Sequence, residues 1–218
     1  MHPRTRSRTT SLVAGMVLAA ASTGISAIDA STRPPNHGRH VTTEAAAPAI
    51  AREGGDAAVS CGIERWDVKT GTDPAATTVD ITAVKPSTVA DLAAIAAPPH
   101  PIRRVEPVEE TVFEVSATLT FYVTEDDSDY HLVLTDRGRT MIAEIPSPDC
   151  VSAGPFKAAI GAARQRFDRR LRRSTSGRKV SIPVTIQGVG FFDRLHHQTG
   201  VAPNGIELHP VVAIALPE

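Results

Sequence analysis

Apolar and polar side chains alternate strictly between Phe113 and Val123. The odd positions of this segment are Phe, Val, Ala, Leu, Phe and Val, whereas the even positions carry Glu, Ser, Thr and Tyr. Successive side chains of a strand point to opposite faces of its sheet, so this period of two predicts one long strand that buries its odd positions.

Two further short strands follow, and then the period changes. Alternation at Tyr130–Leu134 and Met141–Ile145 is separated by the turn residues Asp136-Arg137-Gly138. Spacings of four and three predict a helix, with its apolar face formed by Phe156, Ile160, Ala163, Phe167 and Leu171. Alternation returns over 180–186 and 206–214, which predicts two last strands. We expect Pro183 at an edge or irregular position, and Gly188 and Gly190 to bend or bulge their strand.

The predicted fold class is therefore mostly β, with the element order β-β-β-α-β-β. This order resembles that of the OB-fold over about residues 111–216, which implies a five-stranded barrel with one helix. An α+β sandwich of another topology is the alternative. OB-folds bind ligands on the face of strands two and three and on the loops beside it.

Residues 61–110 form an irregular N-terminal extension that we expect to pack on this OB-like domain of residues 111–218. Ile63, Trp66 and Val68 suggest a short extended stretch that ends in a turn at residues 69–73. A short helix is expected from Ser87 or Thr88, because Val89, Leu92 and Ile95 share one side and Pro98 follows.

The first residues have the order of a secretory signal. Arg4, Arg6 and Arg8 precede an uncharged, mostly apolar run over residues 11–27, with Ala27 or Ala30 suited to the position before cleavage. We therefore assign residues 1–30 to a signal peptide and 31–60, rich in Pro, Ala, Gly and Thr, to a flexible tether. The prediction is a secreted or cell-envelope protein (periplasmic or extracellular) without a stable membrane span after cleavage. A retained N-terminal anchor is the alternative.

Export changes what the two cysteines mean. Cys61 and Cys150 are the only cysteines of the sequence. An even pair in an oxidising compartment predicts a disulfide.

Composition narrows the ligand classes. The formal net charge is −1 and aromatic residues make up 4% of the chain. A net charge so close to zero produces no overall electrostatic field that would attract nucleic acid or membranes. The small number of aromatic side chains limits stacking on bases or sugars.

Four strings resemble a family of uncharacterised exported bacterial proteins. They are residues 61–71 (CGIERWDVKTG), 127–134 (DSDYHLVL), 190–196 (GFFDRLH) and 199–211 (TGVAPNGIELHPV). This resemblance implies export and no particular chemistry.

Polar residues gather in the loops that would flank an OB-type ligand face. The candidate ligand-binding residues are Asp127, Asp129, His131, Asp193, His196, Asn204, Glu207 and His209. A divalent metal is a possible cofactor, held by Asp127, Asp129, His131, His196 and His209, because imidazole and carboxylate groups ligate such ions. Solvated turn acids and structural histidines are the alternative, and the sequence contains none of the standard zinc, EF-hand or serine-hydrolase motifs.

A basic run follows the predicted helix. Arg169, Arg170, Arg172 and Arg173 could contact a polyanion. The alternative is a solvated helix end whose cations complement the helix dipole.

These features favour an exported OB-like binding module for an envelope glycan, an anionic polymer or a protein. A metal-dependent hydrolase, such as a phosphodiesterase or nuclease, is the first alternative, and a structural envelope protein is the second. The sequence identifies no catalytic residue.

Overall fold

The computed structural model describes residues 60–217, which belong to one compact unit. The predicted signal peptide and nearly all of the predicted tether lie outside the described residues. None of the helices in the described part is long and apolar enough to cross a membrane.

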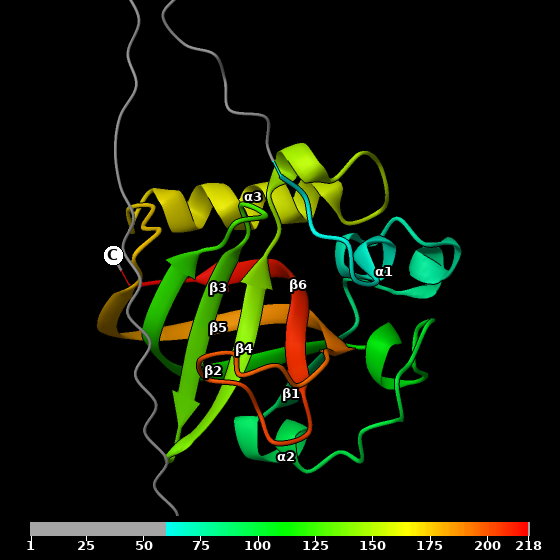
Figure 1. Ribbon diagram of the computed structural model, residues 1–218, viewed down its shortest axis with the longest axis horizontal. Helices are drawn as coiled ribbons and strands as arrows, with labels where there is room; N and C mark the ends of the chain where they lie inside the picture. The colour runs from blue at the N-terminus through cyan, green and yellow to red at the C-terminus, as the bar shows by residue number, and fades with distance from the viewer. Residues whose placement is uncertain (1–59, 218) are drawn as a thin grey trace, which may run out of the picture. The chain divides into compact units, whose positions relative to one another are not determined.

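The described chain is mostly β, with one six-stranded sheet and few helices (Figure 1). Its strands are β1 (Val84–Ser87), β2 (Val112–Thr124), β3 (Tyr130–Asp136), β4 (Arg139–Ile145), β5 (Arg178–Phe192) and β6 (Ile206–Ala215). The α-helices are α1 (Trp66–Thr70), α2 (Val89–Ala93) and α3 (Lys157–Asp168), and the 3₁₀ turns are η1 (Pro74–Thr78), η2 (Val108–Glu110) and η3 (Pro148–Cys150). The five predicted strands and the two predicted helices are all present, whereas β1 was not predicted.

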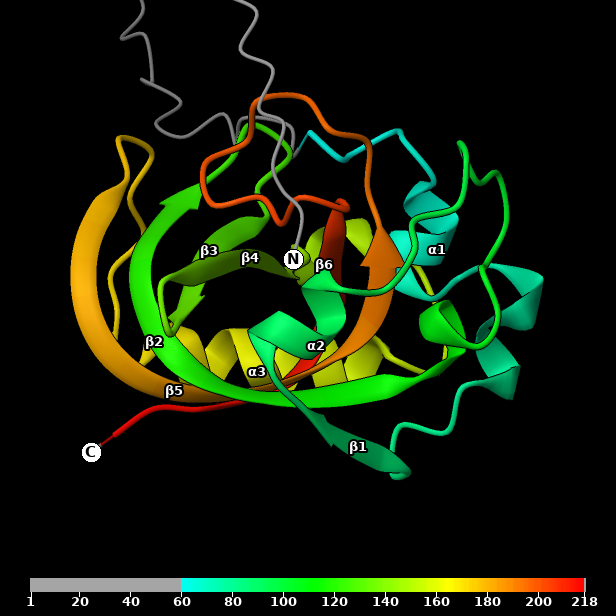
Figure 2. The same ribbon diagram turned by 90° about the horizontal axis from the view of Figure 1, so that it is seen from below.

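The strands pair in the order β1-β2-β3-β4-β6-β5, and β5 also pairs with β2. The β4–β6 and β1–β2 pairs are parallel, and the others are antiparallel. Figure 2 shows the long strands β2 and β5 curving side by side around β3 and β4. The register of β5 against β6 shifts on both sides of Gly188, which agrees with the predicted irregularity at the two glycines.

The prediction for the buried side of β2 is correct only for its first half. Val115 and Leu119 are fully buried, but beyond them Tyr122 and Thr124 are buried while Phe121 and Val123 are only half-buried. The register shifts between Leu119 and Phe121 against both β3 and β5. One extra residue in a strand reverses the side to which later side chains point, so the strict alternation in the sequence concealed a bulge.

The predicted extended stretch at residues 63–68 is also wrong, because Trp66–Thr70 form helix α1. Gly71 ends this helix at φ 66°, where its N–H is bonded to carbonyls of the last turn. A Cβ at Gly71 would lie 1.9 Å from the ring of Phe156, so both the backbone angle and the packing require glycine. Val68 is buried in consequence, whereas Ile63 is 94% exposed.

One side of the sheet forms the main apolar core. Leu132 and Leu134 of β3, Met141 and Ala143 of β4, and Leu208 of β6 are fully buried there. Each large side chain buried in this way contributes about 1.5–3 kcal/mol to folding.

Helix α3 closes this core. Its Phe167 ring lies 5.3 Å from Tyr122 and 4.5 Å from Tyr130, measured between ring centroids. Helix α2 adds Val89 and Leu92, and the Thr88 hydroxyl caps it by accepting from the Asp91 N–H.

The N-terminal extension is joined to the sheet by the predicted disulfide, Cys61–Cys150, which is confirmed with a Cα–Cα distance of 5.6 Å. Two ion pairs join parts of the extension to each other. Arg104 forks onto Asp73, with both side chains nearly buried, and Arg65 pairs with the fully buried Glu109. Glu109 also accepts the backbone N–H groups of Val105 and Phe192, so one carboxylate links the extension to the end of β5.

Candidate functional site

The other side of β3, β4 and β6 carries charged residues, and yet it is buried. We call it the covered face, formed by His131 and Val133 of β3, Ile142 and Glu144 of β4, and Glu207 and His209 of β6. All six residues are buried, and His131, Glu144 and His209 are at most 4% exposed. Segments of the same chain supply the cover, since helix α1 packs against β6 and Gly200 lies against Val133.

A row of three side chains runs across this face. His131 pairs with Glu144 in the β3–β4 register, and Nδ1 of His131 lies 3.0 Å from Oε1 of Glu144. Nδ1 of His209 lies 3.0 Å from the other oxygen, Oε2, and 3.2 Å from Oε1 of Glu207. Glu144 therefore accepts from an imidazole on each side.

His131 carries a proton on both ring nitrogens. Its Nε2 donates to the carbonyl of Thr199 at 2.9 Å, while its Nδ1 faces the Glu144 carboxylate, so both partners are acceptors. Burial alone would lower the pKa of His131, but the hydrogen bond and the charge of Glu144 raise this pKa to about 9. The His131 imidazolium thus holds the residue 193–205 loop over the face.

The same balance applies to the other two members of the row. Burial opposes the charge of His209, but hydrogen bonds to Glu144 and Glu207 raise its pKa to about 10. Burial likewise opposes the charge of Glu144, and the bonds from His131 and His209 hold its pKa well below the usual range.

The carboxyl groups next to the row have pKa values above those of ordinary acids. Burial raises the pKa of Asp129 to about 7, and burial together with the charge of Glu144 does the same for Glu207. Burial also raises the pKa of Glu125, whose Oε1 lies 3.4 Å from Nδ1 of His131.

Lys69 of α1 supplies a positive charge beside these acids. Its Nζ lies 3.5 Å from Oδ2 of Asp193, and burial is outweighed by Glu207, Glu144 and Asp193, which raise the Lys69 pKa. The charged cluster thus consists of Lys69, Glu125, Asp129, His131, Glu144, Asp193, Glu207 and His209.

The predicted site residues divide into two groups. Asp129, His131, Asp193, Glu207 and His209 all lie in the charged cluster. The other candidates have other surroundings. Asp127 accepts the backbone N–H of Asp129 at 3.1 Å, and His196, 53% exposed in its side chain, only approaches Asp193 at 3.7 Å. The Asn204 amide donates to the carbonyls of Leu92 and Ile95, so it joins the β5–β6 loop to α2.

Three members of the cluster escaped the sequence analysis. Glu144 is the clearest, because alternation of Met141, Ala143 and Ile145 already placed it on the side opposite the core. The signal for Glu125 was its position in the acidic turn formed by residues 125–129. No sequence signal pointed to Lys69, because it was expected in a turn rather than in a helix.

The predicted polyanion residues lie elsewhere. Arg169, Arg170, Arg172 and Arg173 follow the end of α3 and are exposed. Arg169 and Arg170 border a hollow of about 280 Å³ together with Leu216 and Pro217. Arg164, in contrast, is nearly buried and stacks over the Tyr130 ring at 3.5 Å while donating to the carbonyls of Ile145 and Ser128.

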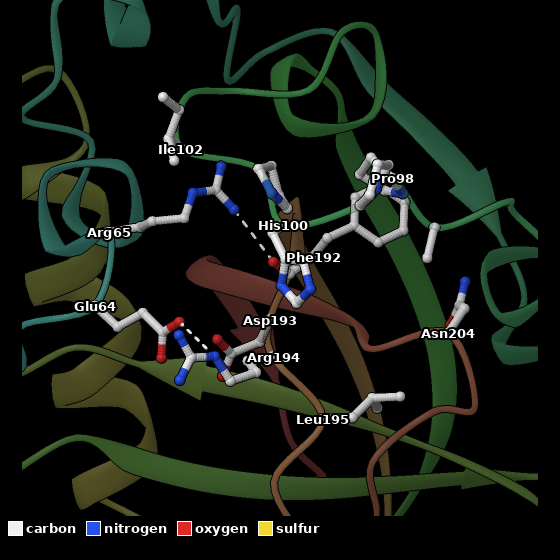
Figure 3. A pocket seen from close by; sticks show the side chains of 13 residues that line it. Glu64, Arg65, Pro98, His100, Ile102, Phe192, Asp193, Arg194, Leu195 and Asn204 are labelled. Carbon is white, nitrogen blue, oxygen red and sulfur yellow. Dashed lines mark hydrogen bonds and ion pairs between the residues drawn. The ribbon is translucent and has the colours of Figure 1, made fainter.

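An open hollow of about 450 Å³ shares Asp193 with the charged cluster (Figure 3). Its walls are the 97–102 connector and the end of β5 with the following loop. The lining residues are Glu64, Arg65, Ala97, Pro98, Pro99, His100, Pro101, Ile102, Phe192, Asp193, Arg194, Leu195 and Asn204. Ile102 and Leu195 are 87% and 56% exposed, which is unusual for large apolar side chains.

Comparisons with known proteins give little further guidance. No protein-family model matches the chain, and no curated protein matches it. One solved structure with similarity is an aspartyl-tRNA synthetase from Leishmania major Friedlin, at 16% identity and a TM-score of 0.37. The match covers 61% of this chain and 20% of the synthetase chain, and at this TM-score it carries no argument. The resemblance to exported bacterial proteins therefore remains a prediction.

Proposed function

We propose that the protein is an exported binding module, and that the hollow at Ile102 and Leu195 docks an extended segment of a partner protein. The observation that carries this proposal is the exposure of these two large apolar side chains on the walls of one hollow. Contiguous apolar surface rimmed by polar groups is typical of protein interaction sites.

The lining favours a polypeptide over the other ligand classes. Phe192 is the only aromatic lining residue other than His100, and it is 4% exposed, so a sugar would find no open ring on which to stack. An anionic polymer needs unpaired cations, whereas Arg194 pairs with Glu64 at 3.3 Å and Arg65 pairs with Glu109.

The 97–102 connector suits an extended partner. Within the described chain, no backbone-to-backbone hydrogen bond joins these residues to another segment, and three of them are prolines. Their free carbonyl groups can accept from the N–H groups of a peptide laid along the connector.

The scaffold that we propose is an OB-like barrel. The pairing order β2-β3-β4-β6-β5 with the additional β2–β5 pair, the parallel β4–β6 pair, and α3 between β4 and β5 support it. In that fold the usual ligand face would correspond to the covered face, which this chain occupies with its own loop and extension. The binding site would thereby move to the adjoining hollow. The same cover leaves the charged cluster without access for a large substrate, so we do not favour the hydrolase alternative.

The docking proposal is tested by screening the purified protein against an array of synthetic peptides of random sequence. We expect peptides rich in apolar residues and proline to be retained, and Leu195→Asp and Ile102→Asp each to weaken the best binder about tenfold or more, a loss of about 1.4 kcal/mol. Ser176→Asp adds the same charge at an exposed position in the loop between α3 and β5 and should leave binding unchanged. Equal binding by all variants, or no sequence preference, would overturn the proposal.

Export is tested separately. The Cys61–Cys150 disulfide supports an oxidising destination. Expression in a bacterial host should yield protein outside the cytoplasm with its N-terminus at Ile28 or Ser31. Full-length protein that remains in the cytoplasm with reduced cysteines would contradict export.

A further inference from the structure

The charged cluster has more carboxylates than permanent cations. It contains Glu125, Asp129, Glu144, Asp193 and Glu207, and Lys69 is its only permanently charged base. The cluster can balance this excess of carboxylates with protons on its acids and histidines or with a bound ion. We propose that the cluster binds one divalent transition-metal ion, of the Zn²⁺ type, between Asp129 and His209 with Glu144 as a third donor.

Two unpartnered atoms locate the ion. Among the described residues, Oδ2 of Asp129 and Nε2 of His209 are buried without a hydrogen-bond partner, and they lie 3.8 Å apart. A buried polar atom without a partner costs about 1–3 kcal/mol, so two that face each other call for a ligand between them.

The other polar side-chain atom of each residue makes hydrogen bonds that hold the residue in place, as is usual for metal ligands. Oδ1 of Asp129 accepts the Ser147 N–H at 2.8 Å. Nδ1 of His209 donates to the Glu207 carboxylate at 3.2 Å. Histidine ligands of metals usually donate their second N–H to a carboxylate, which fixes the tautomer and leaves the other nitrogen free to coordinate.

The distances fit a small ion. Zinc lies about 2.0–2.2 Å from nitrogen and oxygen donors, so one ion can touch two donors that are 3.8 Å apart. One donor atom from each of Asp129, Glu144 and His209 lies within 4.8 Å of the other two. Two donors of one zinc ion are at most about 4.4 Å apart, so the set is close to the size that the ion requires.

The donor set also selects the metal. An imidazole with carboxylates suits zinc and its neighbours, whereas Mg²⁺ and Ca²⁺ require six or more oxygens, usually with several waters. Because the donors are buried under the cover, the ion would stabilise the packing of the loop and extension rather than reach a substrate. This inference is independent of peptide docking at the hollow.

The test is titration of the chelator-stripped, disulfide-bonded protein with Zn²⁺ alone, followed by competition with a coloured chelator. We expect one equivalent to bind with a Kd in the micromolar range or tighter, and Mg²⁺ to fail at the same concentration. Asp129→Asn keeps the shape of the side chain and should weaken Zn²⁺ binding at least about tenfold. His196→Gln removes an exposed histidine near the cluster and should bind like the original protein.

Two results guard the interpretation. X-ray absorption at the zinc edge should show one imidazole and otherwise oxygen donors, and circular dichroism should show that Asp129→Asn is folded. Absence of stoichiometric binding would overturn the proposal. Loss of binding in His196→Gln with retention in Asp129→Asn would overturn it equally.

Discussion

The two sides of β3, β4 and β6 are equally buried, yet they are stabilised by opposite means. The core side contains Leu132, Met141 and Leu208, which are stabilised by apolar packing alone. Apolar side chains of similar volume are expected to replace them at little cost. His131, Glu144 and His209 on the covered face satisfy one another, so each depends on the charge state of the next. Buried charge therefore makes the covered face sensitive to pH and to single substitutions in a way that the core is not.

The largest expected effect comes from removing the shared carboxylate. Glu144→Ala leaves His131 and His209 buried without their common acceptor, and we expect a loss of about 3–5 kcal/mol in the free energy of unfolding. Urea unfolding measures it. Glu144→Met, which fills the volume without charge, is the matched control. If Glu144→Ala costs less than about 1 kcal/mol, the row does not hold the covered face together.

A core substitution should reach a similar size by a different route. Leu132→Ala leaves a cavity and should cost about 2–5 kcal/mol. Because no titrating group is lost, the difference from the original protein should stay constant between pH 6 and 9. A pH-dependent difference in the Leu132→Ala variant would contradict the separation of the two sides.

Loss of the disulfide should affect the covered face more than the core. A double substitution, Cys61→Ser with Cys150→Ser, should lower the free energy of unfolding by about 2–4 kcal/mol, because the closed loop is long. Hydrogen exchange should speed up first in α1 and the 193–205 loop, and last in β3 and β4. Uniform acceleration across the sheet would show that the bond stabilises the whole unit rather than the cover.

The smallest effect expected is that of pH on the metal-free protein. The folded-state pKa values of His131 and His209, about 9 and 10, lie above the ordinary value of 6.5, so their contribution is complete below about pH 6.5 and is lost as pH rises through 9–10. The pKa values of Asp129 and Glu207, both about 7, are also raised above the ordinary values of 3.8 and 4.5, so the stability contributed by their protonated forms is lost as pH rises from about 4 to 7.

All four shifts have the same sign. The chelator-treated protein should therefore be more stable at pH 6 than at pH 9, by at least about 1.4 kcal/mol, which corresponds to one pKa unit. Urea midpoints at the two pH values measure this. Equal midpoints, or a higher midpoint at pH 9, would contradict the protonated state assigned to the histidines.

Periodicity predicted most of the fold because one side of each long strand is apolar. It missed β1, whose segment Val84–Ser87 contains Pro86 and no apolar alternation, and it missed the bulge near Thr120, because β-branched and aromatic residues occupy both sides of β2 there. The pairing of β5 with β2 is a long-range contact that no local pattern encodes.

The cluster could be predicted in part for a related reason. Asp129 and His131 point to the same side of the sheet because they are two residues apart, and the same is true of Glu207 and His209. This can be read from the sequence alone. Their burial was not predictable, because it depends on the cover formed by α1 and the 193–205 loop, which are distant in sequence. The hollow likewise depends on the 97–102 connector and Leu195 lining the same space, which only the folded chain brings about.

The disulfide has a mechanical consequence. Its two cysteines are separated by 89 positions, and the closed loop between them contains α1, β1, α2 and β2–β4. Force applied to the chain before Cys61 is transmitted through the disulfide to Cys150, so the residues between the two cysteines do not bear it. Under tension between the ends of the described part of the chain, only the residues after Cys150 can extend. The strands inside the loop cannot be pulled out until the bond is reduced.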